Sequence, residues 1–297
     1  MAFNLDLSNL AKYINENRDL LISKVASVTD STKWMNIQDG VTADTAIHGL
    51  ITNLKVQDGS DCGFTPDGSQ TVTERTLVPN YLKVNQDYCP KDFYGTYMHY
   101  QTQVAMGKST LPLEEALVND VIKAIAEENE RLLWSGSKAS GDLVDGFATI
   151  IANDSAIPSA NKFTSSKTTV LERVMEMYEK VNNKKYSIVC SMPMYRSLIM
   201  DLVNKNLFVY HEDENNDHTF TIPATNIVVY GIEGLADTDT NLYGVIWDEM
   251  FVGVDTADDE SKFEFAFNQS SRKYDLIVEW VLTCNYMFSE NIWVYSI

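Results

Sequence analysis

The stretch Ser109–Gly136, STLPLEEALVNDVIKAIAEENERLLWSG, carries the signals of one long amphipathic helix. Ser109 or Thr110 offers a side-chain oxygen to the first turn, and Gly136 is able to take the left-handed conformation that ends a helix. A helix over residues 112–134 would be about 36 Å long, roughly twice the usual length. Its apolar stripe consists of Leu113, Leu117, Val121, Ala124, Ile125 and Leu132. In a chain otherwise rich in strands, this rod predicts a spine on which other elements hang.

Composition and charge limit the class of protein. The chain has 297 residues, of which 44% are hydrophobic and 22% charged, as in a folded globular protein. A net charge of −19 repels nucleic acid and argues against a dedicated DNA- or RNA-binding role, although not against enclosing nucleic acid. We expect neither a secretory signal nor a membrane helix. The four cysteines are scattered and unpaired in pattern, which favours free thiols in a reducing compartment.

The first part of the chain is weakly patterned. Residues 4–28 carry a faint helical periodicity, and residues 29–68 are polar and broken by five glycines. An arm that binds neighbouring chains and a flexible N-terminus would both look like this. Residues 70–86 alternate β-formers with polar residues, which predicts a two-stranded excursion with its tip or bend at Pro79-Asn80. Residues 92–106 suit a short helix that leads to the spine.

After the spine, helices and strands alternate. We predict helices over 167–182 and 194–204, a buried strand over 184–192, and further strands over 225–230 and 242–254. The last forty residues alternate strongly, which predicts an antiparallel sheet: Phe263, Phe265, Phe267, Leu276, Val278, Trp280 and Leu282. The predicted fold class is α+β.

Catalytic and ligand-binding motifs are weak. The sequence has no phosphate-binding glycine loop, no nucleophile elbow and no H-E-x-x-H zinc motif. His211 and His218 bracket the acidic run HEDENNDH, which favours a solvated loop over a metal site. Asp237, Asp239 and Asn241 begin like a calcium loop, but Leu242 replaces the required glycine, so a turn is the better interpretation.

The cysteines and aromatic clusters also favour structural roles. Cys190 lies in the apolar run SIVC, where a small buried thiol is normal, and Cys89 has only Lys91 nearby to lower its pKa. The aromatic residues near Tyr94–Tyr100 and Trp280–Tyr295 favour a core or an interface over a ligand box. We therefore assign no catalytic, cofactor-binding or metal-binding residue, and predict that the chain is not an enzyme.

The order of these features resembles the major capsid proteins of tailed bacteriophages, which have the Hong Kong 97 type fold. Residues 132–151, LLWSGSKASGDLVDGFATII, are similar to the segment after the family's spine helix, with Gly136 and Gly146 at its glycine positions. Residues 192–206, MPMYRSLIMDLVNKN, resemble the helix of the axial (A) domain, and residues 225–238, TNIVVYGIEGLADT, the strand and turn after it.

The resemblance implies a division of the whole chain. The predicted parts are an N-terminal arm at 1–59, an extended hairpin (the E-loop) with its return at 60–100, a peripheral (P) domain at 101–165 with the spine helix at 112–134, the A-domain at 166–255, and C-terminal strands at 256–297. Some relatives join subunits through a lysine and an asparagine. Lys83 and Lys91 lie near the proposed E-loop, but no partner is marked, so we predict no cross-links.

By the same resemblance, the chain assembles with itself as pentamers and hexamers into an icosahedral shell. The shell encloses double-stranded DNA without sequence-specific binding, in the virion, after assembly in the host bacterial cytoplasm. A separate scaffolding protein, a portal and decoration proteins are the implied partners, with assembly without a scaffold as the alternative, and with no membrane and no cofactor. Two other classes stay open: an encapsulin-like nanocompartment around a protein cargo, and a soluble enzyme of unfamiliar type.

Overall fold

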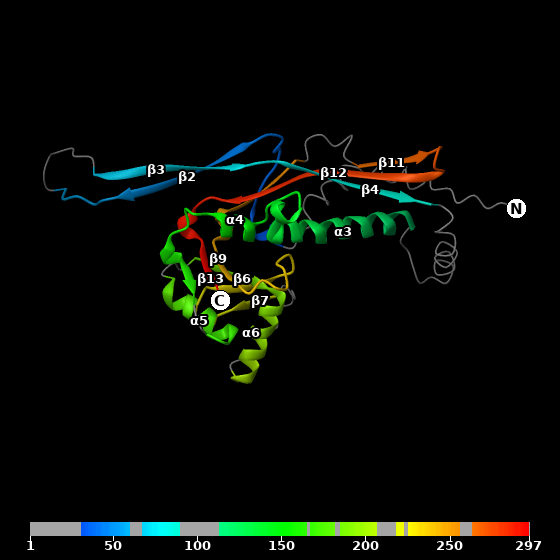
Figure 1. Ribbon diagram of the computed structural model, residues 1–297. Helices are drawn as coiled ribbons and strands as arrows, with labels where there is room; N and C mark the ends of the chain where they lie inside the picture. The colour runs from blue at the N-terminus through cyan, green and yellow to red at the C-terminus, as the bar shows by residue number, and fades with distance from the viewer. Residues whose placement is uncertain are drawn as a thin grey trace.

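The structure is mixed α and β, which confirms the predicted fold class. This computed structural model describes residues 31–59, 67–89, 113–164, 167–181, 185–206, 218–222, 225–255 and 263–296. Two sheets lie on either side of one long helix, and a two-stranded hairpin projects beyond them (Figure 1). The helices predicted over 4–28 and 92–106, and the predicted helix cap at Ser109 or Thr110, lie outside the described residues.

The long helix α3 spans Leu113–Ser135 and confirms the predicted spine. Its buried stripe packs on the first sheet, and the indole nitrogen Nε1 of Trp280 donates to Oδ1 of Asn129 across 3.0 Å. Ala124 was expected in this stripe but is exposed. It lies at the open edge of a groove between α3 and the sheet, where the helix face turns toward solvent.

Gly136 ends α3 for a different reason from the one predicted. It does not have a positive φ; instead, a Cβ at this position would lie 2.4 Å from the carbonyl oxygen of Leu132 and 2.6 Å from that of Val144. The amide of Gly146 donates to the carbonyl of Gly136 across 2.9 Å. A Cβ on Gly146 would lie 2.6 Å from the carbonyl oxygen of Leu132. Both glycines are needed for close backbone packing at the end of the helix.

The first sheet covers the apolar stripe of α3. Its strands are β1 Asn36–Gln38, β4 Asn80–Tyr88, β10 Met250–Val254, β11 Phe263–Asn268 and β12 Lys273–Tyr286. Strand β12 is central: β11 pairs with its first half, β4 pairs with residues 274–282 along its other edge, and β10 pairs with its end. This antiparallel pairing of β11 with β12 confirms the prediction from the alternating C-terminal sequence.

The second sheet has its own helical cover. Its strands, in spatial order, are β5 Lys162–Thr164, β13 Trp293–Ser296, β9 Leu242–Val245, β6 Ser187–Ser191, β8 Val228–Ile232 and β7 Thr219–Thr221. Helices α5 (Val170–Lys180) and α6 (Met192–Asn204) pack on it and confirm two predicted helices. The strand-like stretch predicted over 242–254 is confirmed as two strands, β9 and β10, which belong to different sheets.

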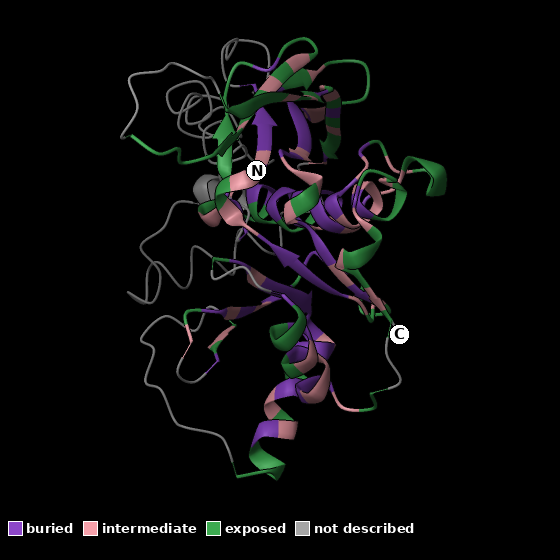
Figure 2. Ribbon diagram, turned by 90° about the vertical axis from the view of Figure 1, so that its left-hand side faces the viewer, coloured by how far each residue is buried: buried purple, intermediate pink, exposed green. Residues whose placement is uncertain are grey.

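Short helices and an aromatic cluster join the two sheets. The helices are η1 Thr32–Trp34, η2 Lys138–Ser140, α4 Phe147–Asn153, η3 Ser159–Asn161, η4 Trp247–Glu249 and η6 Ser289–Asn291. The ring of Trp247 lies within 6.2 Å of the rings of Trp34, Trp134 and Tyr230, measured between centroids. Buried residues are concentrated along α3 and in the strands and helices of the second sheet (Figure 2).

The hairpin is a separate two-stranded sheet of β2 (Thr45–Leu54) and β3 (Gly68–Leu77). The excursion predicted over 70–86 has the wrong pairing, because β3 pairs with β2 whereas β4 pairs with β12. Pro79-Asn80 is thus a bend between two sheets. The predicted boundary between residues 59 and 60 falls in the connection between β2 and β3.

Candidate assembly surfaces

The hairpin β2–β3 exposes one entire face. Neither strand pairs with any other described strand. Leu50 and Val72 lie directly opposite each other and keep exposed fractions of 59% and 66%. Leu54 on the same face is 83% exposed, and Val56 beyond it is 95% exposed. Several exposed apolar side chains on one face are costly to leave in water. This face, which carries Leu50, Leu54 and Val72 and is called the outer face below, is therefore a candidate binding surface.

The opposite face of the hairpin is packed at its base. A Cβ on Gly49 would lie 2.5 Å from Cζ of Phe288, so only glycine allows this approach. Leu77, the last residue of β3, is fully buried. Arg75 lies between these points and forms an ion pair with Asp154, which follows α4. Among the described residues, the hairpin is therefore attached along one face only, over the half nearer its base.

Asp154 is the centre of a polar cluster that the sequence did not indicate. Its Oδ2 accepts from the hydroxyl of Tyr286 across 2.6 Å and from that of Ser289 across 3.1 Å, in addition to Arg75 Nη2. Burial alone would raise the pKa of Asp154, but the hydrogen bonds from Tyr286 and Arg75 hold that pKa well below its ordinary value. Burial likewise raises the pKa of Tyr286, so its hydroxyl stays protonated as a donor.

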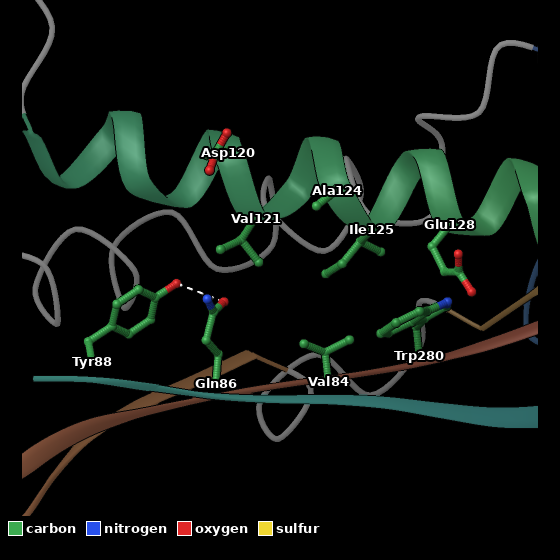
Figure 3. A pocket seen from close by; sticks show the side chains of 9 residues that line it. All are labelled: Val84, Gln86, Tyr88, Asp120, Val121, Ala124, Ile125, Glu128 and Trp280. Carbon is green, nitrogen blue, oxygen red and sulfur yellow. Dashed lines mark hydrogen bonds between the residues drawn. The ribbon is translucent and has the colours of Figure 1, made fainter.

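A groove opens between α3 and the first sheet. Its cavity has a volume of about 360 Å³. In Figure 3, side chains of α3 face side chains of β4 and β12 across the opening, and Tyr88 donates to Oε1 of Gln86 across 3.0 Å. The lining is largely apolar with acidic groups from α3: Val84, Gln86, Tyr88, Asp120, Val121, Ala124, Ile125, Glu128 and Trp280. Glu128 also pairs with Arg131 across 2.7 Å.

The residues considered for chemistry do not come together. His211 lies outside the described residues, and the described His218 is exposed, with its carbonyl accepting from the amide of Gly231. Asp239 closes a turn: its Oδ1 accepts from the amide of Asn241 and its Oδ2 from the hydroxyl of Tyr243. Within the described residues, no three histidines, cysteines or acids are arranged to hold a metal ion.

The cysteines are placed as structural residues. Cys190 is fully buried in β6, and burial raises the pKa of its thiol to about 12, which opposes a nucleophilic role. Cys89 is half-buried after β4. Lys83 pairs with Glu279 on β12 across 3.0 Å, and Lys91 lies outside the described residues. None of the helices in the described ranges is both long and apolar enough to span a membrane.

Comparison with known proteins was made by sequence and by structure. Neither known protein families nor curated protein sequences give a match to the sequence. By structure, a chain of the satellite phage P4 procapsid aligns with 100% of this chain and 92% of its own length, at 8% identity and a TM-score of 0.60. A chain of Mycobacterium phage Cain aligns with 99% of this chain and 98% of its own, at 12% identity and a TM-score of 0.55.

Similar structures are not limited to phages. A chain of a holo-encapsulin complex from Synechococcus elongatus aligns with 91% of this chain and 88% of its own, at 8% identity and a TM-score of 0.50. Identities this low establish the fold and not the activity. The near-complete coverage in both directions confirms the predicted architecture: the chain has the Hong Kong 97 type fold of phage capsid proteins.

Proposed function

We propose that this chain is the major capsid protein of a tailed bacteriophage and builds an icosahedral shell around double-stranded DNA. The observation that carries the proposal is the hairpin β2–β3, which has no strand partner among the described residues and leaves Leu54 83% exposed. An isolated two-stranded hairpin is marginal in water, so a partner surface is needed to stabilise it. Neighbouring copies in a shell supply that surface repeatedly.

Strand pairing supports a revised division of the chain. We assign the hairpin at residues 45–77 as the E-loop, which shortens the N-terminal arm relative to the sequence-based boundary at 59. We assign α3 with the first sheet to the P-domain, and the second sheet with α5 and α6 to the A-domain. The C-terminal strands then belong to both, because β12 lies in the first sheet and β13 in the second.

The acidic balance fits a container for DNA. A net charge of −19 per chain disfavours tight binding of phosphate, which would impede movement of the genome. We therefore propose that DNA is enclosed and not bound by sequence. The further partners are a separate scaffolding protein, a portal and decoration proteins, and assembly takes place in the host bacterial cytoplasm before the shell becomes part of the virion.

Electron microscopy of the full-length protein tests this function. The protein is expressed alone and together with candidate scaffolding proteins, and its products are separated by sedimentation. Closed particles, or rings of five and six subunits, are the expected products. Exclusively monomers or dimers under all conditions would contradict the proposal and return attention to an enzyme.

An encapsulin-like shell is the second candidate, favoured by the structural match to an encapsulin. The two functions differ in what the particle contains. Nuclease treatment of particles purified from the native source, followed by nucleic-acid extraction, is expected to yield protected double-stranded DNA. Particles that instead contain a stoichiometric second protein and no DNA would favour the nanocompartment.

A further inference from the structure

The hairpin acts as a lever, so its function depends on the angle at its base. Ten residues per strand at about 3.3 Å each make it about 33 Å long. A rotation of about 10° at the base would move its outer end by about 6 Å, which is more than one strand spacing. Contacts that hold the base therefore decide where the outer face of the hairpin is presented.

The ion pair of Arg75 and Asp154 is placed to set this angle. Arg75 is on β3, whereas Asp154 is held by the body: its Oδ1 accepts from the amide of Ala156 across 2.7 Å, and its Oδ2 from Tyr286 and Ser289. The guanidinium of Arg75 also lies 4.3 Å from the centroid of the Tyr286 ring, and Nη2 donates to Ser289. A planar guanidinium held by a carboxylate, a hydroxyl and a ring has one orientation.

Burial distinguishes this pair from the other ion pair of the hairpin. The side chains of Arg75 and Asp154 are 20% and 13% exposed, whereas those of Lys55 and Asp67 near the far end are 74% and 40% exposed. Exposed pairs contribute little, because water and salt screen them. A largely buried pair resists separation, because either charge alone would be left without a partner at low dielectric.

We propose that Arg75 and Asp154 form a clamp that fixes the direction of the β2–β3 hairpin relative to the body, and thereby makes the assembled shells uniform. Gly49, in the middle of β2, allows the hairpin backbone to rest on Phe288 beside this clamp. The first half of the proposal concerns the free subunit and stands independently of function. The second half rests on the proposed shell function.

The distance between two spin labels on the full-length subunit, measured by electron paramagnetic resonance, tests the first half of the proposal. Labels attached through a non-canonical amino acid at Thr52 on the hairpin and Lys123 on α3, both exposed, avoid reaction at the native cysteines. Dilution with unlabelled protein restricts the signal to pairs within one chain. The native distribution is expected to be narrow, and that of Arg75→Gln or Asp154→Asn wider by about 4 Å or more, the displacement that a 10° swing gives Thr52, seven residues from the base.

Matched variants keep this test decisive. Lys55→Gln removes the exposed pair and is expected to leave the distribution unchanged. The double variant Arg75→Gln/Asp154→Asn leaves no unpaired charge, so it folds even where a single variant does not, and it is also expected to broaden the distribution. Distributions of the clamp variants that superimpose on the native one would overturn the clamp.

Particle sizes test the second half. Native protein and Lys55→Gln are expected to give one narrow class of diameters in electron micrographs, and Asp154→Asn a mixture of sizes and open sheets. Uniform native-sized particles from a variant with a broadened hairpin distribution would overturn the link to uniformity. Absence of particles from the native protein itself would contradict the proposed function while leaving the distance result on the clamp intact.

Discussion

The hairpin β2–β3 and the second sheet represent two ways of stabilising strands. The second sheet is covered by α5 and α6, and its central strand β6 is buried along most of its length. The hairpin has ten residues in each strand but only two buried ones, Leu77 at its base and Gly49 in the middle of β2. The sheet is therefore stabilised by its own core, whereas the hairpin is held over the half nearer its base and has no strand partner among the described residues.

This difference predicts that stability and assembly depend on different regions of the subunit. Changes in the second sheet are expected to affect folding of the subunit, and changes on the outer face of the hairpin to affect association while leaving the subunit folded. A protein that builds shells needs both kinds of region, since a subunit must fold before it meets its neighbours and still retain surface to bury on them.

The largest expected contrast in unfolding free energy comes from making the same substitution, leucine to alanine, in both regions. Leu198 on α6 is fully buried, and Leu198→Ala is expected to lower the free energy of unfolding by about 2–5 kcal/mol through lost burial and a cavity. Leu54→Ala on the hairpin, at 83% exposure, is expected to change it by less than about 0.5 kcal/mol. Denaturant unfolding followed by circular dichroism measures both.

For the assembly of particles, the effect is expected from the hairpin variant. Leu54→Ala is expected to reduce the yield of closed particles, because it removes apolar area that neighbouring copies would bury. Equal losses of stability in the two variants, or an unchanged particle yield for Leu54→Ala, would contradict the proposed division of roles.

The clamp at the hairpin base is expected to contribute stability that depends on pH. Asp154→Asn should lower the free energy of unfolding by about 1–3 kcal/mol near neutral pH, since Arg75 loses its charged partner. The pKa of Asp154 is lowered in the folded state from an unfolded value of about 3.9, so its contribution is complete above about pH 5. That contribution is lost progressively as the pH falls through 4 and below.

The measurement is the difference in unfolding free energy between native protein and Asp154→Asn across pH 3–7. The difference should be constant at higher pH and shrink below about pH 4. Besides Asp154, the charged and titratable groups at the site are Arg75, Lys162 and Tyr286. Nζ of Lys162 donates to the carbonyl of Asp154 across 3.3 Å, and burial raises the pKa of Tyr286. A difference that grows in acid would contradict the assigned cause.

Elements with a strong local period were predictable. The stripe of α3, the helices α5 and α6 and the alternation in β11 and β12 each repeat a burial pattern within one element, which a single sequence displays. Strand β2 has no such pattern, because apolar Leu50 and Leu54 lie on its exposed face and Gly49 takes the place of a large residue at its contact with Phe288. Its partner β3 also runs almost directly into β4, so two strands of different sheets look like one excursion.

The contact between Arg75 and Asp154 could not be predicted from the sequence, because it too has no local pattern. Arg75 and Asp154 are 79 residues apart, and an arginine in a polar strand is usually a solvated side chain. Only the fold reveals that both are largely buried. Gly136 shows a similar limit: a glycine after a helix predicted a left-handed cap, whereas the carbonyl of Val144, 2.6 Å from a would-be Cβ, is what requires it.

Alanine substitutions at two glycines compare how tightly the hairpin is packed at Gly49 and at its far end. Gly49→Ala is expected to cost about 1–3 kcal/mol of unfolding free energy, because its Cβ would overlap Cζ of Phe288 at 2.5 Å and Cγ of Met287 at 2.8 Å. Gly59→Ala, with no atom within 4 Å of its Cβ, is expected to change that free energy by less than about 0.5 kcal/mol. Equal effects would mean that the hairpin is no better packed at Gly49 than at its far end.

The smallest effect is expected on the outer surface of the first sheet. Lys83 and Glu279 form a cross-strand pair with exposed fractions of 50% and 46%, so Lys83→Gln should change the unfolding free energy by less than about 0.5 kcal/mol. Because Lys83 is on β4 and already faces Glu279, it is not on the projecting hairpin where a covalent partner on a neighbour would be sought. Denaturing electrophoresis of purified particles should therefore show single chains for both native protein and Lys83→Gln. A ladder of multiples that disappears in Lys83→Gln would assign this lysine a covalent role and move part of the assembly function from the hairpin to the body of the subunit.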